Sequence, residues 1–297
     1  MILQTRAGEG CAEHGKETRT EPSCLLSAEI TVRYPGKEPV LRNLKLDIQK
    51  GEVLGLIGQS GSGKSTLALA ILGLLGHQRT RVEGRIDFQG ADLLTMPECD
   101  LRKLRGRTLA LVLQSPLASL NPALRLRTQL EEAWRAHRAP SSTKADCESA
   151  IRSALTSVSL PASDDFLAKR SSQLSVGQAQ RVLIAMAVMH RPALLLADEA
   201  TSALDVITQS EILQLFARLN RETGMSILYI SHDLPSVAGI CHRIAILNEG
   251  QIVECGPSEQ IFGTPSDPYT QRLMASLPRI PSRPDANSAK SQTAAGG

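Results

Sequence analysis

One glycine-rich segment constrains the fold of this chain more than any other. Residues 58–65 read GQSGSGKS and fit the pattern G-x-x-x-x-G-K-[ST]. They lie between an apolar run at 52–57 and a helical stretch at 64–75, so the sequence predicts a buried parallel strand, a turn and a helix. Glycines let successive backbone N–H groups curl around an anion, and the helix N-terminus adds the positive end of its dipole. The segment therefore predicts a phosphate site.

The residue types in this segment suit particular parts of a nucleotide. We expect the Lys64 ammonium to reach the β- and γ-phosphates and the Ser65 hydroxyl to ligate Mg²⁺. Further contacts are expected from the rest of the loop and the helix start: Gly58, Gln59, Ser60, Gly61, Ser62, Gly63 and Thr66. A turn without a ligand is the alternative, but a chance match in a chain this long is on the order of one in a hundred.

Two adjacent acids end a second apolar run, which reads LLLADE at 194–199. Asp198 is placed to hold Mg²⁺, directly or through water. Glu199 is then placed to polarise an attacking water as general base, a role worth roughly 10²–10⁴ in rate. Alone, the two acids could mark only a strand end at solvent. The phosphate loop upstream favours the interpretation that both acids belong to the same site as the loop.

The order of apolar runs predicts the fold class. Short apolar strands at 52–57, 193–198 and 226–231 alternate with helical patterns, which indicates an α/β fold with a parallel sheet and ligands at the strands' carboxyl ends. Residues 116–175 differ, because they show helical spacing and lack β-branched runs. We read this stretch as a helical subdomain inserted into the α/β core.

Composition narrows the classes of protein further. The chain has 297 residues, of which 42% are hydrophobic, enough for a sizeable core. A net charge of +3 is too small to indicate a nucleic-acid partner. The basic run at 102–107 lacks interleaved aromatic residues and is read as a solvated face. Six scattered cysteines without a C-x-x-C pair are typical of free thiols in a reducing compartment.

The two ends and the longest apolar run bear on localisation. Residues 1–24 are polar and are expected to be a flexible leader rather than a signal peptide, and 281–297 a disordered tail. The longest apolar run, at 67–76, is well short of the ~20 residues that span a bilayer. We expect a soluble chain whose membrane role comes from partners.

A further motif connects the chain to a known family. Residues 174–178 read LSVGQ, end 20 residues before Asp198, and resemble the LSGGQ signature of ATP-binding-cassette (ABC) proteins. Other motifs of that family follow in the expected order. Tyr34 stands where the family stacks an aromatic ring on adenine. Gln114 follows the predicted strand 109–113, where the family has a glutamine that serves the magnesium and catalytic site.

Two later positions complete the resemblance, which covers about 25–280. Residues 202–205 read SALD, and Asp205 matches a dimer-contacting position. His232 matches the histidine that touches the γ-phosphate. The resemblance implies a P-loop NTPase core with a parallel sheet, an ABC-type antiparallel β subdomain and an inserted α-helical signature subdomain. It places the ATPase domain at 25–256.

The resemblance also implies that the chain works in pairs. In the family, two subunits pack head to tail, so Ser175, Gly177 and Gln178 of one would face the γ-phosphate on the other. With one phosphate loop and one signature, this chain is expected to be half of such a dimer, using ATP and Mg²⁺. Two positions depart from the family pattern: Val176 replaces a glycine, and Ala200 stands where proline is commonest.

Two stretches resemble one branch of the family. Residues 114–122 (QSPLASLNP) look like a block of peptide and nickel importers, and 257–280 resembles the C-terminal extension of the dipeptide, oligopeptide and nickel group. Asp267 replaces the usual histidine of that extension, and residues 169–172 depart from the branch pattern. Because no cysteine follows Cys255, no iron–sulfur cluster is expected.

The expected function is that of an ATP-hydrolysing subunit of an ABC importer for peptides, nickel or a related small ligand. Its expected partners are integral-membrane permease subunits, a second ATP-binding subunit (itself or a sister chain), and a periplasmic or lipid-anchored solute-binding protein, with no nucleic acid. It would sit peripherally on the cytoplasmic side of the inner membrane.

Two alternatives remain. A DNA-repair or chromosome-type ABC ATPase would separate the loop from the signature by a long coiled coil, whereas Lys64 and Ser175 are 111 residues apart without sustained heptads. A non-hydrolysing regulatory module would be expected to lack Glu199 or His232.

Overall fold

A six-stranded sheet forms the centre of the protein in the computed structural model, which describes residues 24–75 and 80–276. Its strand order is β10 (Gln251–Pro257), β9 (Arg243–Asn248), β3 (Val53–Ile57), β8 (Ser226–Ser231), β7 (Leu194–Asp198) and β6 (Leu109–Val112). Neighbouring strands are parallel except β9 and β10. The parallel sheet predicted from the apolar runs is therefore confirmed. The predicted leader, apart from Cys24, and the predicted tail lie outside the described residues.

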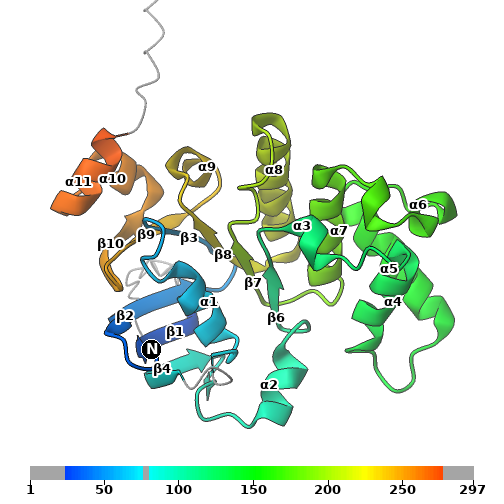
Figure 1. The fold of residues 1–297 in the computed structure, drawn as a ribbon, viewed down its shortest axis with the longest axis horizontal. Helices are drawn as coiled ribbons and strands as arrows, with labels where there is room; N and C mark the ends of the chain where they lie inside the picture. Colours follow the sequence, from blue (N-terminus) through cyan, green and yellow to red (C-terminus); the bar gives the residue numbers. More distant parts are fainter. Residues whose placement is uncertain (1–23, 76–79, 277–297) are drawn as a thin grey trace, which may run out of the picture.

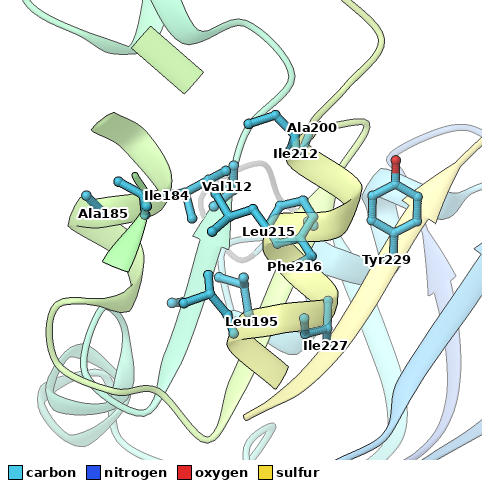
Figure 2. Close-up of a cluster of buried hydrophobic side chains, with 14 of the residues drawn as sticks. Val112, Ile184, Ala185, Leu195, Ala200, Ile212, Leu215, Phe216, Ile227 and Tyr229 are labelled. Atoms are coloured by element: carbon cyan, nitrogen blue, oxygen red, sulfur yellow. The ribbon is translucent and has the colours of Figure 1, made fainter. Parts of the chain in front are cut away.

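The central strands are apolar throughout because both faces of the sheet are covered. In β7, Leu195 and Ala197 point to one hydrophobic cluster, whereas Leu194 and Leu196 point to another. Figure 2 shows part of the first cluster, in which Phe216 of α8 (Val206–Thr223) packs on the sheet beside side chains of α7 (Val176–Val188). Two helices thus hold one face, and they begin at the two segments that the sequence singled out, the signature and the SALD motif.

A four-stranded antiparallel sheet and one helix cover the other face. The strand order is β2 (Pro39–Gln49), β1 (Cys24–Arg33), β4 (Arg81–Phe88) and β5 (Ala91–Asp92). Buried and exposed residues alternate along much of β1, as expected for a strand with one solvated face. Helix α1 (Lys64–Ile71) packs in the same cluster as this sheet, directly after the glycine-rich loop. Figure 1 shows the antiparallel sheet beside α1.

The helices between β6 and β7 form a group to one side of the sheets (Figure 1). They are α3 (Pro116–Ser119), α4 (Leu126–Arg135), α5 (Lys144–Ser157), α6 (Asp164–Ala168), a 3-10 turn (Ser171–Gln173) and α7. The remaining helices are α2 (Glu98–Leu104), α9 (Leu234–Ala238), α10 (Ser258–Gly263) and α11 (Pro268–Ala275). Helices α10 and α11 lie at the opposite end of the molecule from the helical insert. Within 24–75 and 80–276, no helix has the length and apolarity needed to cross a bilayer.

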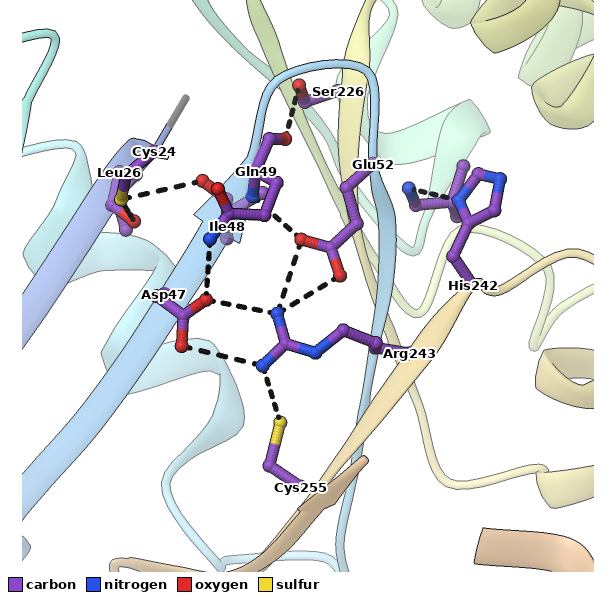
Figure 3. A network of polar contacts seen from close by, with 11 residues as sticks. Cys24, Leu26, Asp47, Ile48, Gln49, Glu52, Ser226, His242, Arg243 and Cys255 are labelled. Atoms are coloured by element: carbon purple, nitrogen blue, oxygen red, sulfur yellow. Dashed lines mark hydrogen bonds and ion pairs between the residues drawn. The ribbon is translucent and has the colours of Figure 1, made fainter. Parts of the chain in front are cut away.

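A polar network joins the antiparallel sheet to the central sheet (Figure 3). Arg243, at the start of β9, lies with its guanidinium 3.0 Å from Asp47 of β2 and 3.2 Å from Glu52. Burial opposes the ionisation of Asp47, but hydrogen bonds from Arg243 and Gln49 outweigh it and hold the pKa of Asp47 below its usual value. Glu52 is 7% exposed, so its carboxylate is buried against this arginine.

Replacing Arg243 by methionine should lower the free energy of unfolding by about 2–3 kcal/mol, because Glu52 would be left buried without its cation. Urea denaturation at neutral pH measures the change. The matched control is Arg85→Met, which removes an arginine paired with Asp87 on the exposed face of β4 and should change stability little. Equal effects of the two substitutions would contradict this role for Arg243.

Candidate nucleotide and catalytic site

Close packing explains why two positions of the loop are glycine. A Cβ at Gly58 would lie 2.4 Å from the Leu247 carbonyl oxygen, and one at Gly63 would lie 2.5 Å from a methyl group of Leu41. Gly63 also has a φ of 110°, which favours glycine. The loop therefore passes tightly between β9 and β2 before α1 begins at Lys64. Gly61 has a φ of 83° and open space around it, so its backbone is free to face a ligand.

Lys64 lies at the centre of the loop. It is 5% exposed, and its ammonium donates hydrogen bonds to the carbonyl oxygens of Gly58 at 2.8 Å and Gln59 at 3.0 Å. Burial lowers the pKa of Lys64, and the carboxylates of Glu199 and Asp198 oppose that shift. A cavity of about 180 Å³ opens beside it, lined by Val40, Ser60, Gly61, Gly63, Lys64, Ser65, Thr66 and Glu199. The structure thus gathers loop residues and Glu199 around one space.

Asp198 ends β7 beside the loop. Burial raises the pKa of Asp198, and a hydrogen bond from Ser65 opposes the shift. One of its carboxylate oxygens, Oδ1, is buried and has no hydrogen-bond partner within the described part of the chain. A carboxylate and a hydroxyl are hard oxygen ligands of the kind that Mg²⁺ prefers, and a cation would satisfy the orphaned oxygen. The residues present therefore fit a magnesium ion.

Asp198→Asn should raise the melting temperature of the nucleotide-free protein at neutral pH. The pKa of Asp198 is higher in the folded chain than in the unfolded chain. The folded state is therefore destabilised as the pH rises from the unfolded-state pKa of Asp198 through its folded-state pKa. The amide removes that destabilisation. The matched variant Asp47→Asn should change the melting temperature in the opposite direction, since the pKa of Asp47 is lowered. A lower melting temperature for Asp198→Asn would contradict the argument.

Glu199 occupies a strained position between two cavities. Its φ is 47°, in the left-handed region, and its N–H donates to the Ile230 carbonyl at 3.0 Å. Its carboxylate Oε1 lies 3.3 Å from Nδ1 of His232. A second cavity of about 180 Å³ is lined by Glu199, Thr201, Ser202, Gln209, Ser231, His232 and Asp233. Such strain persists where the surrounding structure fixes it, which is common at functional sites.

Tyr34 and Gln114, which were predicted from family motifs, differ in their distance from the site. The Tyr34 hydroxyl is 3.4 Å from the Thr66 hydroxyl, so Tyr34 lies beside the start of α1. Its contact with adenine stays a prediction. Gln114 is exposed just after β6 and, in the described part of the chain, does not line either cavity at Glu199. Its contacts with Mg²⁺ and with water also stay predictions.

The signature begins α7 with a reciprocal cap. The Ser175 hydroxyl accepts from the Gln178 N–H at 3.1 Å, and the Gln178 side chain accepts from the Ser175 N–H at 3.2 Å. Gly177 is required by packing, since a Cβ there would lie 2.6 Å from a methyl carbon of Thr208. Among the described residues, none of the signature positions lines the cavities at Glu199. Their contact with a second subunit's nucleotide stays a prediction.

Asp205 caps the neighbouring helix α8. Its carboxylate accepts from the N–H groups of Ile207 at 3.1 Å and Thr208 at 3.0 Å, and from the Thr208 hydroxyl at 2.7 Å. These bonds lower the pKa of Asp205. Because Thr208 also lies against Gly177, the start of α8 is next to the start of α7.

Sequence reasoning missed two contacts that support the site. Thr201 and Tyr229 share a buried hydrogen bond of 2.8 Å, and the Gln209 amide donates to Asp233 at 2.9 Å. The first was detectable in principle, because a tyrosine in a buried strand needs a partner for its hydroxyl. The first contact joins the segment after Glu199 to β8, and the second joins α8 to the residue that follows His232.

Comparisons with known proteins match two parts of the chain to family profiles. The profile of the ABC transporter family matches residues 41–202, and that of the oligopeptide/dipeptide transporter C-terminal region matches 253–296. A dipeptide transport ATP-binding protein of Haemophilus influenzae is 40% identical over 255 residues, which cover 85% of this chain and 77% of the relative. A glutathione import ATP-binding protein of Salmonella typhimurium is 39% identical over 258 residues, covering 84% of this chain and 41% of the relative.

The extent of coverage differs among these relatives. The chain spans 41% of the length of the glutathione import proteins and 48% of a peptidoglycan transport ATP-binding protein of Agrobacterium fabrum. A dipeptide transport ATP-binding protein of Bacillus subtilis is 38% identical over 83% of this chain and 73% of the relative.

Solved structures share the fold. A dimeric ATP-binding cassette, MJ0796, in a post-hydrolysis state bound to ADP and Pi, has a TM-score of 0.67 and 28% identity, covering 78% of this chain and 98% of that one. The cbiO1 protein of Clostridium perfringens, part of an ABC transporter complex, has a TM-score of 0.71 and 25% identity over 86% of this chain and 97% of that one. By its sequence, its fold and its motifs, this chain belongs to the ABC transporter family.

Proposed function

We propose that this chain is the ATP-binding and ATP-hydrolysing subunit of an importer of short peptides. The observation that carries the proposal is the convergence of Lys64, Asp198 and Glu199. Lys64 and Glu199 line one cavity, Asp198 lies close enough to influence the pKa of Lys64, and Glu199 also lines the cavity of His232. A phosphate cradle, a cation ligand and a base at one place are the parts that hydrolysis of a nucleoside triphosphate needs.

Each side chain then has one task. Lys64 exchanges its two carbonyl partners for phosphate oxygens and neutralises their charge. Ser65 and Asp198, with Gln114, would hold Mg²⁺, which when bound neutralises further phosphate charge. Glu199 accepts a proton from the water that attacks the γ-phosphorus, and the bond from phosphorus to the bridging oxygen breaks, giving ADP and phosphate. His232 contacts the γ-phosphate and, through its 3.3 Å approach, orients Glu199.

The second ATP-binding chain completes the site in this proposal. Ser175 is exposed at the N-terminus of α7, a helix of 13 residues, where the dipole favours an anion. The signature of each chain would therefore face the γ-phosphate held by the other. Dimeric solved relatives, one of them bound to ADP and Pi, support this arrangement. Hydrolysis separates the γ-phosphate from the nucleotide, and with it the negative charge that holds the two chains together.

The membrane partner is proposed to dock next to Gln114. Leu113 and Leu117 are 47% and 46% exposed, so apolar surface flanks this glutamine. A permease helix seated there would couple hydrolysis to transport. The chain would then lie peripherally on the cytoplasmic side of the membrane.

Short peptides are the substrate class that the relatives support best. Their names specify import of glutathione or transport of dipeptides and oligopeptides, and the C-terminal profile is that of oligopeptide and dipeptide transporters. A solute-binding protein outside the membrane would select the peptide.

Purification of the tagged chain from its own membranes tests the proposal. Permease subunits and a solute-binding protein should copurify, and di- or tripeptides should stimulate ATP hydrolysis by the complex. A nickel–chelator complex is the comparison ligand. Stimulation by that complex alone would overturn the peptide assignment, and purification that recovers no permease subunit with the chain would overturn the transport role.

A further inference from the structure

A basic cavity lies between α2 and the end of α4, apart from the nucleotide site. Its volume is about 310 Å³. The residues that line it are Cys99, Arg102, Lys103, Arg107, Ala136, His137 and Arg138. Within the described residues, none of these lines the cavities at Glu199. The site is thus separate from the proposed hydrolysis.

A tight turn brings these distant segments together. Gly106 has a φ of 78°, and its N–H donates to the Leu109 carbonyl at 2.7 Å. A Cβ at Gly106 would lie 2.7 Å from Nε2 of His137, so the imidazole ring rests on the turn. On its other side, the His137 ring meets that of His190 edge to face, with centroids 5.4 Å apart. Glycine is required here, and the contact fixes the basic run beside the end of α4.

The charge of this cavity is not neutralised from within. Lys103 pairs with Asp100 at 2.6 Å, and the neighbouring Arg105 donates to the Leu72 carbonyl oxygen at 2.6 Å and pairs with Glu98. By contrast, no ion pair of Arg102, Arg107 or Arg138 is found within 24–75 and 80–276, and none of the described lining residues is an acid. Burial, His190 and Arg107 together lower the pKa of His137. The solvated face expected at 102–107 is therefore a concave cationic surface.

We propose that this cavity binds a phosphate group. Three guanidinium groups around one small space match a tetrahedral anion, which offers more acceptor oxygens than a carboxylate and accepts paired N–H groups from arginine. The volume exceeds what one phosphate group needs, so a phosphate ester also fits. The group can come from a soluble phosphate compound or from an anionic phospholipid headgroup, and the experiment distinguishes these sources.

The first arm follows the His137 ring by NMR in the full-length chain with ¹³C-labelled histidines, its signal being identified with His137→Gln. Inorganic phosphate is titrated at constant ionic strength against acetate, in a Lys64→Ala background that weakens binding at the glycine-rich loop. Phosphate should shift the His137 signal saturably and raise the pKa of His137. Arg107→Ala and Arg138→Ala should each weaken the affinity roughly tenfold or more.

The matched control is Arg135→Ala. Arg135 lies on the last turn of α4, pairs with Glu131 and does not line the cavity, so its removal should leave the affinity unchanged. An equal shift with acetate, or an equal loss in Arg135→Ala, would overturn the phosphate site.

The second arm tests the lipid source by flotation with phosphatidylcholine vesicles, with and without phosphatidylglycerol. Binding only to the anionic vesicles, lost in Arg107→Ala and Arg138→Ala and kept in Arg135→Ala, would support the headgroup. A phosphate response in the first arm without vesicle binding would support a soluble compound. No response in either arm would overturn the proposal.

Discussion

Lys64→Ala should weaken the affinity for Mg²⁺–ATP by a factor of about a hundred or more. The ammonium is buried at the centre of the loop and already holds two acceptors, at 2.8 and 3.0 Å. Each hydrogen bond between charged groups contributes about 1.5–3 kcal/mol, so the loss of two phosphate contacts gives a change of this size. Equilibrium binding of a fluorescent ATP analogue to the purified chain measures it.

The matched control for this substitution is Lys50→Ala. Lys50 is an exposed lysine in the turn between β2 and β3, and its removal should leave the affinity unchanged. Circular dichroism verifies that both variants are folded. An unchanged affinity in a folded Lys64→Ala protein would show that the glycine-rich loop is not the nucleotide site.

Glu199→Gln should reduce ATP hydrolysis by roughly 10²–10⁴-fold while ATP still binds. The amide keeps the size of the side chain and the hydrogen-bonding reach toward His232, but it cannot accept the proton of the attacking water. Because hydrolysis is what would release the second chain, the ATP-bound dimer should accumulate. Phosphate release by the complex purified from membranes, measured at saturating ATP, checks the rate.

Glu249→Gln controls for the backbone strain at Glu199. Glu249 has almost the same φ, 46°, and is exposed in the turn between β9 and β10. Its replacement should leave hydrolysis unchanged, so a loss specific to Glu199→Gln reports on the carboxylate. Near-normal hydrolysis by Glu199→Gln would contradict its role as the base.

The parts of the fold that follow from local pattern were predicted from the sequence. Strands β3, β7 and β8 are short apolar runs, and such runs are typical of parallel strands that are buried on both faces. The proximity of Lys64 and Glu199 also follows, because parallel strands bring their carboxyl ends to one edge. The motif spacing and the expected topology were therefore enough to predict that Lys64 and Glu199 lie close together.

Contacts between segments far apart in the chain could not be predicted. The ion pair of Arg243 with Asp47 depends on how the two sheets meet, and that depends on side chains from both. The turn at Gly106 looked like part of a solvated basic run, because only the folded chain shows the His137 ring against it.

In the proposed dimer, a triphosphate lies between the loop of one chain and the signature of another. Sedimentation of Glu199→Gln with Mg²⁺–ATP, alone and with the second ATP-binding chain recovered from membranes, tests it most directly. Ser175→Arg is added to the same protein, and Thr143→Arg controls for loss of a helix cap, since Thr143 caps α5 in the same way. We expect ATP-dependent association that Ser175→Arg abolishes and Thr143→Arg preserves, with ATP still bound to the dissociated chain. Association that does not depend on nucleotide, either alone or with the second ATP-binding chain, would contradict this arrangement. Association that persists in Ser175→Arg would contradict it as well.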